Sequence, residues 1–107
     1  MYTYNLTLIR VKDGDTIEGV IDLGFRLSYK TSIRLAETFA PELKTPDGPR
    51  SKERLEQLLV GPLTVRTVLN REFEKYGRVL GYVTANTTVD VNKTLVLEGY
   101  ATKEPVK

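Results

Sequence analysis

The sequence contains neither histidine nor cysteine among its 107 residues. The absence of histidine excludes Ser-His-Asp triads, histidine-based acid–base catalysis and most zinc enzymes. The absence of cysteine excludes disulfides and thiolate metal sites, and it leaves the redox compartment undetermined. Any catalysis must therefore use Asp, Glu, Lys, Arg, Tyr, Ser or Thr side chains.

Long hydrophobic segments are also missing. No apolar run approaches the length of a membrane span, and the N-terminal MYTYNLTLIR lacks the basic and apolar blocks of a signal peptide. We therefore expect a soluble, intracellular protein with no membrane partner. The formal net charge of +2 is too small to indicate nucleic-acid binding by itself. Residues 63–78 hold four basic and two acidic side chains, which fits either a mild positive field or a solvated strand face.

The apolar pattern predicts a single domain, residues 1–107, built mainly of strands. Period-two alternation predicts strands at 2–11, 15–23, 25–35, 63–70 and 77–84, with a hairpin turn at 22–25 and Phe25 on the apolar face of the third strand. The apolar positions change parity at Leu8 and Ile9, which predicts a β-bulge. Helices are predicted at 49–60, where Pro49 suits the first helical position, and at 90–98.

This order of elements favours a small closed barrel. Five short strands remove both sheet edges only by closing on themselves, and the five-stranded OB barrel is the usual solution. We therefore expect an α+β protein, mainly β. It would be an antiparallel OB-fold barrel with one helix after the third strand and a short C-terminal helix.

The segment DGDT at 13–16 places the carboxylates of Asp13 and Asp15 on either side of one glycine. Asp and Gly are common turn residues, so a tight turn between two strands explains the segment. The alternative is a hard-cation site, because Mg²⁺ and Ca²⁺ prefer clustered carboxylate oxygens. The segment alone leaves both interpretations open.

Three further charged residues stand beside loops: Arg34, Glu42 and Arg78. Each has a simple structural explanation, as a strand-face cation, an acid before a helix and a hairpin cation. Together with Asp15 they match phosphodiester hydrolysis, which needs a divalent cation, cationic donors to the phosphate oxygens and a carboxylate that activates water. Arginine suits the donor role because its planar fork matches phosphate geometry.

Five segments resemble, in order, the successive blocks of the staphylococcal nuclease (thermonuclease) family: VKDGDTIEGVIDLGF, IRLAETFAPE, GPRSKERLEQLL, EKYGRVLGYV and VNKTLVLEGYA. The likeness covers nearly the whole chain, and its compact length is similar to the small phage and plasmid-type members. The resemblance implies an OB barrel that cleaves DNA or RNA with Ca²⁺ or another divalent cation. We expect a monomer, encoded by a phage.

The resemblance also implies roles for single residues. Asp15 would ligate the cation, with Asp13 in its outer shell. Arg34 and Arg78 would grip the phosphate, and Glu42 would orient or deprotonate the attacking water. The backbone carbonyl of Ala40 would also ligate the cation, whereas Lys75 and Tyr76 would flank the bound nucleotide.

One position departs from the family pattern. The family has an aspartate, a second direct metal ligand, where this chain has Phe39, although the spacing from Arg34 to Glu42 is retained. A phenyl ring cannot coordinate a hard cation. Glu37 lies two residues back and could share the face of Phe39 on an extended strand. We expect Phe39 to lie over the groove rather than in the core, where it would contact substrate by stacking on a base.

Three hypotheses follow. The first is an OB-barrel phosphodiesterase whose metal site is weakened by Phe39. The second is a catalytically inactive module of the same fold that binds nucleic acid or a protein. The third is a purely structural barrel, which would show no effect of divalent ions on stability.

Overall fold

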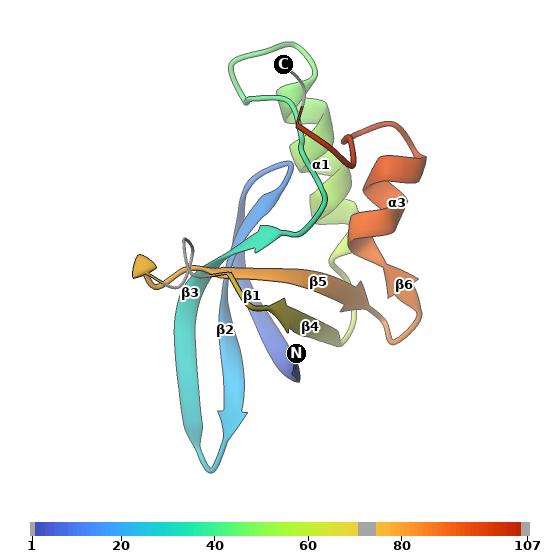
Figure 1. The fold of residues 1–107 in the computed structure, drawn as a ribbon. Helices are drawn as coiled ribbons and strands as arrows, with labels where there is room; N and C mark the ends of the chain where they lie inside the picture. The colour runs from blue at the N-terminus through green and yellow to red at the C-terminus, as the bar shows by residue number, and fades with distance from the viewer. Residues whose placement is uncertain (1, 71–74, 106–107) are drawn as a thin grey trace.

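A computed structural model of the chain describes residues 2–70 and 75–105. The strands and helices follow one another along the chain in the order that the sequence predicts, with one additional short strand, β6 (Figure 1). In chain order they are β1 (Thr3–Asp13), β2 (Thr16–Gly24), β3 (Leu27–Leu35), α1 (Gly48–Leu58), β4 (Leu63–Val68), β5 (Val79–Ala85), β6 (Val89–Asp90) and α3 (Val91–Leu97).

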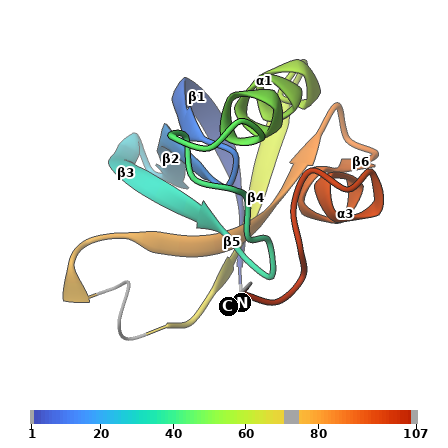
Figure 2. The same ribbon diagram turned by 90° about the horizontal axis from the view of Figure 1, so that it is seen from above.

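The strands form one sheet in the order β3-β2-β1-β4-β5-β6, and an additional pairing of β3 with β5 closes the first five strands into a barrel. The expected OB-fold type of α+β architecture is thereby confirmed. The expectation that every pair is antiparallel is wrong, because Ile33–Leu35 pairs with Val79–Gly81 in the parallel sense. Parallel neighbours require a long crossover, and the segment containing α1 and β4 supplies it (Figure 2).

Two details of the β1–β2–β3 meander bear on the sequence predictions. The β1–β2 register shifts between Leu8 and Arg10, which confirms the bulge at Ile9. The hairpin turn, in contrast, was placed too early. Gly24 still pairs with Leu27, so the turn falls at Phe25 and Arg26. Phe25 is therefore not on the apolar face of β3, and its side chain is 97% exposed.

The barrel interior is filled by fully buried branched side chains such as Ile17, Ile33 and Val65. The helices add Leu55 from α1 and Leu95 from α3 to the same core. Helix α1 packs against β1, α3 packs against β5, and both lie away from the projecting β2–β3 hairpin (Figure 1). Within the described part of the chain, neither helix is long and apolar enough to cross a membrane.

Candidate active site

The DGDT segment is the turn between β1 and β2, and it is packed tightly against two other segments. Gly14 lies so close to them that an added Cβ would be 2.6 Å from the Ala40 Cβ and 2.7 Å from the Ser51 Cβ. A larger residue would therefore push the turn away from the loop after β3 and from α1. The turn interpretation of DGDT holds, and it does not exclude a role for the two acids.

Asp15 is held in the middle of this contact with only 14% of its side chain exposed. Its Oδ2 accepts a hydrogen bond from the Ala40 N–H at 2.9 Å and lies 3.4 Å from an Arg34 guanidinium nitrogen. Its Oδ1 accepts from the Thr16 hydroxyl at 3.1 Å, and its own N–H donates to the Asp13 carboxylate at 3.0 Å. The two acids therefore lie together, as the cation hypothesis requires.

The electrostatic state of Asp15 reflects this crowding. Burial raises the pKa of the Asp15 carboxyl above its usual range, and the neighbouring Asp13 carboxyl raises it further. The Ala40 N–H and the Arg34 guanidinium act in the opposite direction but do not cancel the rise. A carboxylate pair of this kind gains from a bound cation, because the cation removes the repulsion between the two groups.

Arg34 links the turn to the loop after β3. One terminal nitrogen donates to the carbonyl oxygens of Leu35, at 2.6 Å, and Thr38. Its guanidinium carbon lies 4.8 Å from the centroid of the Phe39 ring. Phe39 is half-buried above the arginine rather than in the core, and its backbone exchanges two hydrogen bonds with Thr102. The structure thus places Phe39 beside the Asp15–Arg34 pair, as its position in the sequence predicts.

Glu42 and Ala40 lie on the loop after β3. The Glu42 side chain is 72% exposed and pairs with Lys44 at 3.3 Å. The Ala40 N–H donates to Asp15, and the cation contact expected of its carbonyl stays a prediction. Among residues 2–70 and 75–105, no group of three or more acidic side chains is placed to hold a metal ion. Glu42 therefore does not complete a carboxylate cluster with Asp13 and Asp15 in this conformation.

The second predicted arginine, Arg78, immediately precedes β5. Arg34 pairs with Leu80 of that strand in the parallel sense, so the backbone of Arg78 lies near the end of the β3–β5 pairing. The Arg78 guanidinium carbon lies 5.5 Å from the ring centroid of Tyr76, and the Lys75 ammonium lies 5.6 Å from it. Tyr76 is exposed, so the three predicted substrate-side residues form one aromatic and cationic surface.

A cleft of about 460 Å³ lies beside this surface, and it is lined by residues of β1, β2, β3 and the loop before β5. Lys12, Lys30 and Arg78 line it together with hydroxyl groups from Thr31 and Ser32, among others. Lys12 donates to the Ser32 hydroxyl at 2.7 Å. The lining residues of β3 were not predicted as site residues. The available signal was the polar half of the alternation in β3, which includes Lys30, Ser32 and Arg34.

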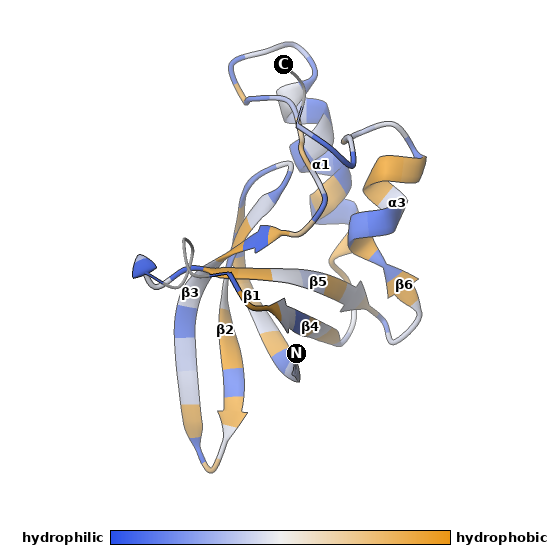
Figure 3. Cartoon of the chain, viewed as in Figure 1, coloured by the Kyte–Doolittle hydropathy of each residue, from blue (hydrophilic) through white to orange (hydrophobic). Residues whose placement is uncertain are grey.

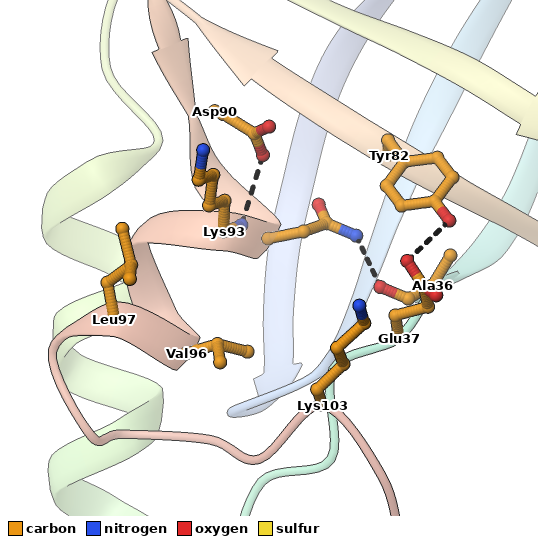
Figure 4. Close-up of a pocket in the computed structure, with 9 residues that line it drawn as sticks. Ala36, Glu37, Tyr82, Asp90, Lys93, Val96, Leu97 and Lys103 are labelled. Atoms are coloured by element: carbon orange, nitrogen blue, oxygen red, sulfur yellow. Dashed lines mark hydrogen bonds between the residues drawn. The ribbon is translucent and has the colours of Figure 1, made fainter.

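A different cavity, of about 340 Å³, lies between β5 and α3 (Figure 4). There the Tyr82 hydroxyl donates to Glu37 at 2.9 Å, and the Asn92 amide donates to the Ala36 carbonyl at 2.9 Å. Asn92 also accepts from the Val83 N–H, so this buried side chain ties α3 to β5 and to the loop after β3. The cavity is lined by other residues than the predicted site, and Asn92 stabilises the fold.

The fold and the site define a small OB-type barrel in which the acids of the β1–β2 turn lie beside Arg34 near the end of β3. The sequence model of the staphylococcal nuclease homologue family matches residues 32–107. The chain belongs to that family.

Curated relatives agree with this assignment. An "Uncharacterized endonuclease" of Escherichia coli is 39% identical over 95 residues, covering 88% of this chain and 57% of the relative. A "Micrococcal nuclease" of Shigella flexneri is 31% identical over 105 residues, covering 88% of this chain and 55% of the relative. The chain thus spans about half the length of the curated relatives it matches.

Proposed function

We propose that the chain hydrolyses phosphodiester bonds in DNA or RNA with a divalent cation held by Asp15 and Asp13. The observation that carries the proposal is the Asp15 carboxylate, which is nearly buried beside Asp13 and beneath Arg34, with a raised pKa. Perturbed ionisable groups of this kind concentrate at functional sites. Relatives named as nucleases support the same reaction class.

The donor set suits a cation that is only partly enclosed by protein. Ca²⁺ takes six to eight oxygen ligands, whereas Mg²⁺ is commonly held by one or two carboxylates with water and substrate phosphates. Asp15 and Asp13 supply that smaller number, and Phe39 supplies none. When bound, the cation would polarise a phosphoryl oxygen and lower the pKa of water. We infer that the substrate phosphate completes the coordination.

The arginines would bind the phosphate group. Arg34 on β3 and Arg78, which precedes the adjacent strand β5, would both donate to non-bridging oxygens as negative charge develops. Tyr76 and Lys75 would bind the adjacent nucleotide by stacking and by charge. Phe39, beside Arg34, offers a second ring for a base.

Glu42 would activate the attacking water after a local rearrangement. Its exposed ion pair with Lys44 is of a kind that contributes only ~0–1 kcal/mol, so little opposes its departure toward the site. Catalytic geometry often forms only when substrate is bound. We expect Glu42→Gln to retain nucleic-acid affinity and to lower turnover, whereas lost affinity with unchanged turnover would assign Glu42 a binding role.

The second candidate is a non-catalytic nucleic-acid-binding module. The specific observation in its favour is Phe39 over Arg34, together with the lack, among the described residues, of a group of three acidic side chains that could hold a metal ion. Such a module would keep the cationic surface around Tyr76, and this second candidate predicts binding of nucleic acid without cleavage.

The test is a cleavage assay on single-stranded DNA, duplex DNA and RNA with Mg²⁺, Ca²⁺ or a chelator. Wild type should cleave with a divalent cation and lose activity with the chelator. Asp15→Ala should abolish cleavage and Arg34→Ala should lower it by ~10²–10³-fold. The exposed α1 residue Arg50 provides a charge-matched control, since Arg50→Ala should leave the rate unchanged. Binding without cleavage by wild type under every condition would favour the second candidate.

A further inference from the structure

The turn at the tip of the β2–β3 hairpin contains residue types that are unusual for its backbone conformation. Phe25 and Arg26 form the two-residue turn with φ values of 53° and 65°. Such turns favour Asn-Gly, because both positions are left-handed. Bulky residues are rare there and mark strain that is often functional. The Phe25 side chain is 97% exposed, so burial does not explain its presence.

The hairpin is continuous with the candidate active site. Side chains alternate along a strand, so Arg34, Ser32, Lys30 and Ser28 lie on one face of β3. Lys30 lines the same cleft as Lys12 and Arg78. The acid of that cleft, Glu18, lies 3.5 Å from Arg10, so the cleft presents mainly positive charge. Figure 3 shows hydrophilic segments along β3 that lead to a tip where hydrophilic and hydrophobic residues meet.

We propose that a single strand of nucleic acid runs from the active site along the outer face of β3 to the hairpin tip. Lys12 and Lys30 would bind a phosphate in the cleft, with Ser32 as a neutral donor. Phe25 would stack on a base at the far end, and Arg26 would contact the adjoining backbone. The proposal rests on the proposed function for its choice of polymer and extends it to a second, remote contact region.

The chemistry favours a single strand over a protein partner. An exposed aromatic ring beside cations matches how proteins bind unpaired bases and their phosphates. Eight residues separate Arg34 from Arg26, a span of about 26 Å at ~3.3 Å per residue. At ~3.4 Å per nucleotide, the rise in a duplex strand, this corresponds to at most roughly eight nucleotides. An unpaired strand extends beyond that rise and covers the distance with fewer nucleotides, so only very short oligonucleotides should fail to reach Phe25.

The experiment measures binding in a chelator, so that cleavage plays no part. Fluorescence anisotropy with thymidine homopolymers of about 3 and about 12 nucleotides would compare wild type with Phe25→Asn and Lys30→Ala. Phe25→Asn should lower the affinity for the longer oligonucleotide about fivefold or more and leave the affinity for the shorter one unchanged. Lys30→Ala should weaken binding and lower the magnitude of the salt slope by ~0.7. The controls are Leu97→Ala, an exposed apolar residue on α3, and Arg50→Ala on α1.

Thermal melting separates function from structure at the tip. Asn tolerates the left-handed conformation better than Phe, so Phe25→Asn should melt at the same or a higher temperature while it binds more weakly. Equal affinity of wild type and Phe25→Asn for the longer oligonucleotide would overturn the proposal. If Phe25→Asn changes the oligomeric state, measured by light scattering, the hairpin tip is a contact between copies of the chain, and the single-strand proposal is also overturned. If the short oligonucleotide binds and the long one binds no tighter, only this proposal fails; if neither binds, the proposed function fails as well.

Discussion

Replacing Phe39 with aspartate tests whether the Asp13–Asp15 turn is a metal site that lacks one ligand. The substitution adds a carboxylate beside Arg34 and removes the ring that lies 4.8 Å from its guanidinium carbon. The backbone hydrogen bonds between Phe39 and Thr102 do not depend on the side chain and should remain. The expected result is a protein that is less stable without cation but responds strongly to cation.

The size of the stability loss follows from where the ring lies. Phe39 is half-buried and does not belong to the core cluster of the described residues. The loss should therefore be closer to a cation–π contact, ~0.5–2 kcal/mol, than to the ~3–5 kcal/mol of a core phenylalanine. A loss of ~1 kcal/mol lowers the melting temperature of a domain of this size by ~4–8 °C.

The cation response has a calculable magnitude. A ligand at 100 times its dissociation constant stabilises the native state by about 2.7 kcal/mol, which exceeds the expected loss. Phe39→Asp should thus regain its melting temperature when Mg²⁺ or Ca²⁺ is added, and it should cleave single-stranded DNA at lower cation concentrations than wild type. The assays are thermal melting and cleavage, each across a cation titration.

Phe39→Asn is the matched control, since it removes the ring and adds a polar group without the charge. If Phe39→Asp folds yet gains no more from cation than Phe39→Asn, the Asp13 and Asp15 carboxylates are not arranged around a cation. A melting temperature lowered by more than ~20 °C in both variants would show instead that the ring supports the core.

Three further predictions concern the same turn and loop. Asp15→Asn should be more stable than wild type at neutral pH without cation. The raised pKa means that ionisation of Asp15 opposes folding, so the contribution of Asp15 to the free energy of unfolding falls as pH rises through its folded-state pKa. Equal pH profiles of stability for wild type and Asp15→Asn would contradict this. Gly14→Ala should lose ~1–3 kcal/mol in chemical denaturation, because its Cβ would overlap the Ala40 and Ser51 side chains, and unchanged stability would refute the close contact. Arg34→Lys should lower both cleavage and melting temperature, since lysine cannot bond the loop carbonyls and Asp15 together; full activity would remove Arg34 from the phosphate site.

The barrel was predictable because its signals are local. Alternation located each strand, and the change of parity at Ile9 located the bulge that the β1–β2 register contains. The parallel closure of β3 on β5 was not predictable in this way, because it depends on a crossover through α1 and β4. The hairpin tip was misplaced because Gly24 resembles a turn residue, although it pairs within the strand and the turn falls on Phe25 and Arg26.

The site was predictable where adjacent strands carry it and less so where a loop does. Thr16 pairs with Arg34 across β2 and β3, so the acids of the DGDT turn necessarily lie near that arginine. Glu42 depends instead on the loop after β3, whose path turns at Glu37 with a φ of 50° and then buries Thr38. That path has no periodic signal in the sequence. Its consequence, an exposed Glu42, became visible only in three dimensions.

Under the proposed function, the charge balance of the site would allow a chain with Phe39 at the expected aspartate position to use a cation. Asp15, beside Asp13, pairs with Arg34, and two further cations, Arg78 and Lys75, lie around the exposed Tyr76 ring. A third acid would favour cation binding before substrate arrives, whereas the present balance would favour binding of the polyanion first. The phosphate would then add the negative oxygens that the protein lacks, and cation and nucleic acid would each raise the affinity of the other by the same factor. Phe39 would thus shift the site from a cation-loaded resting state toward one that assembles on its substrate.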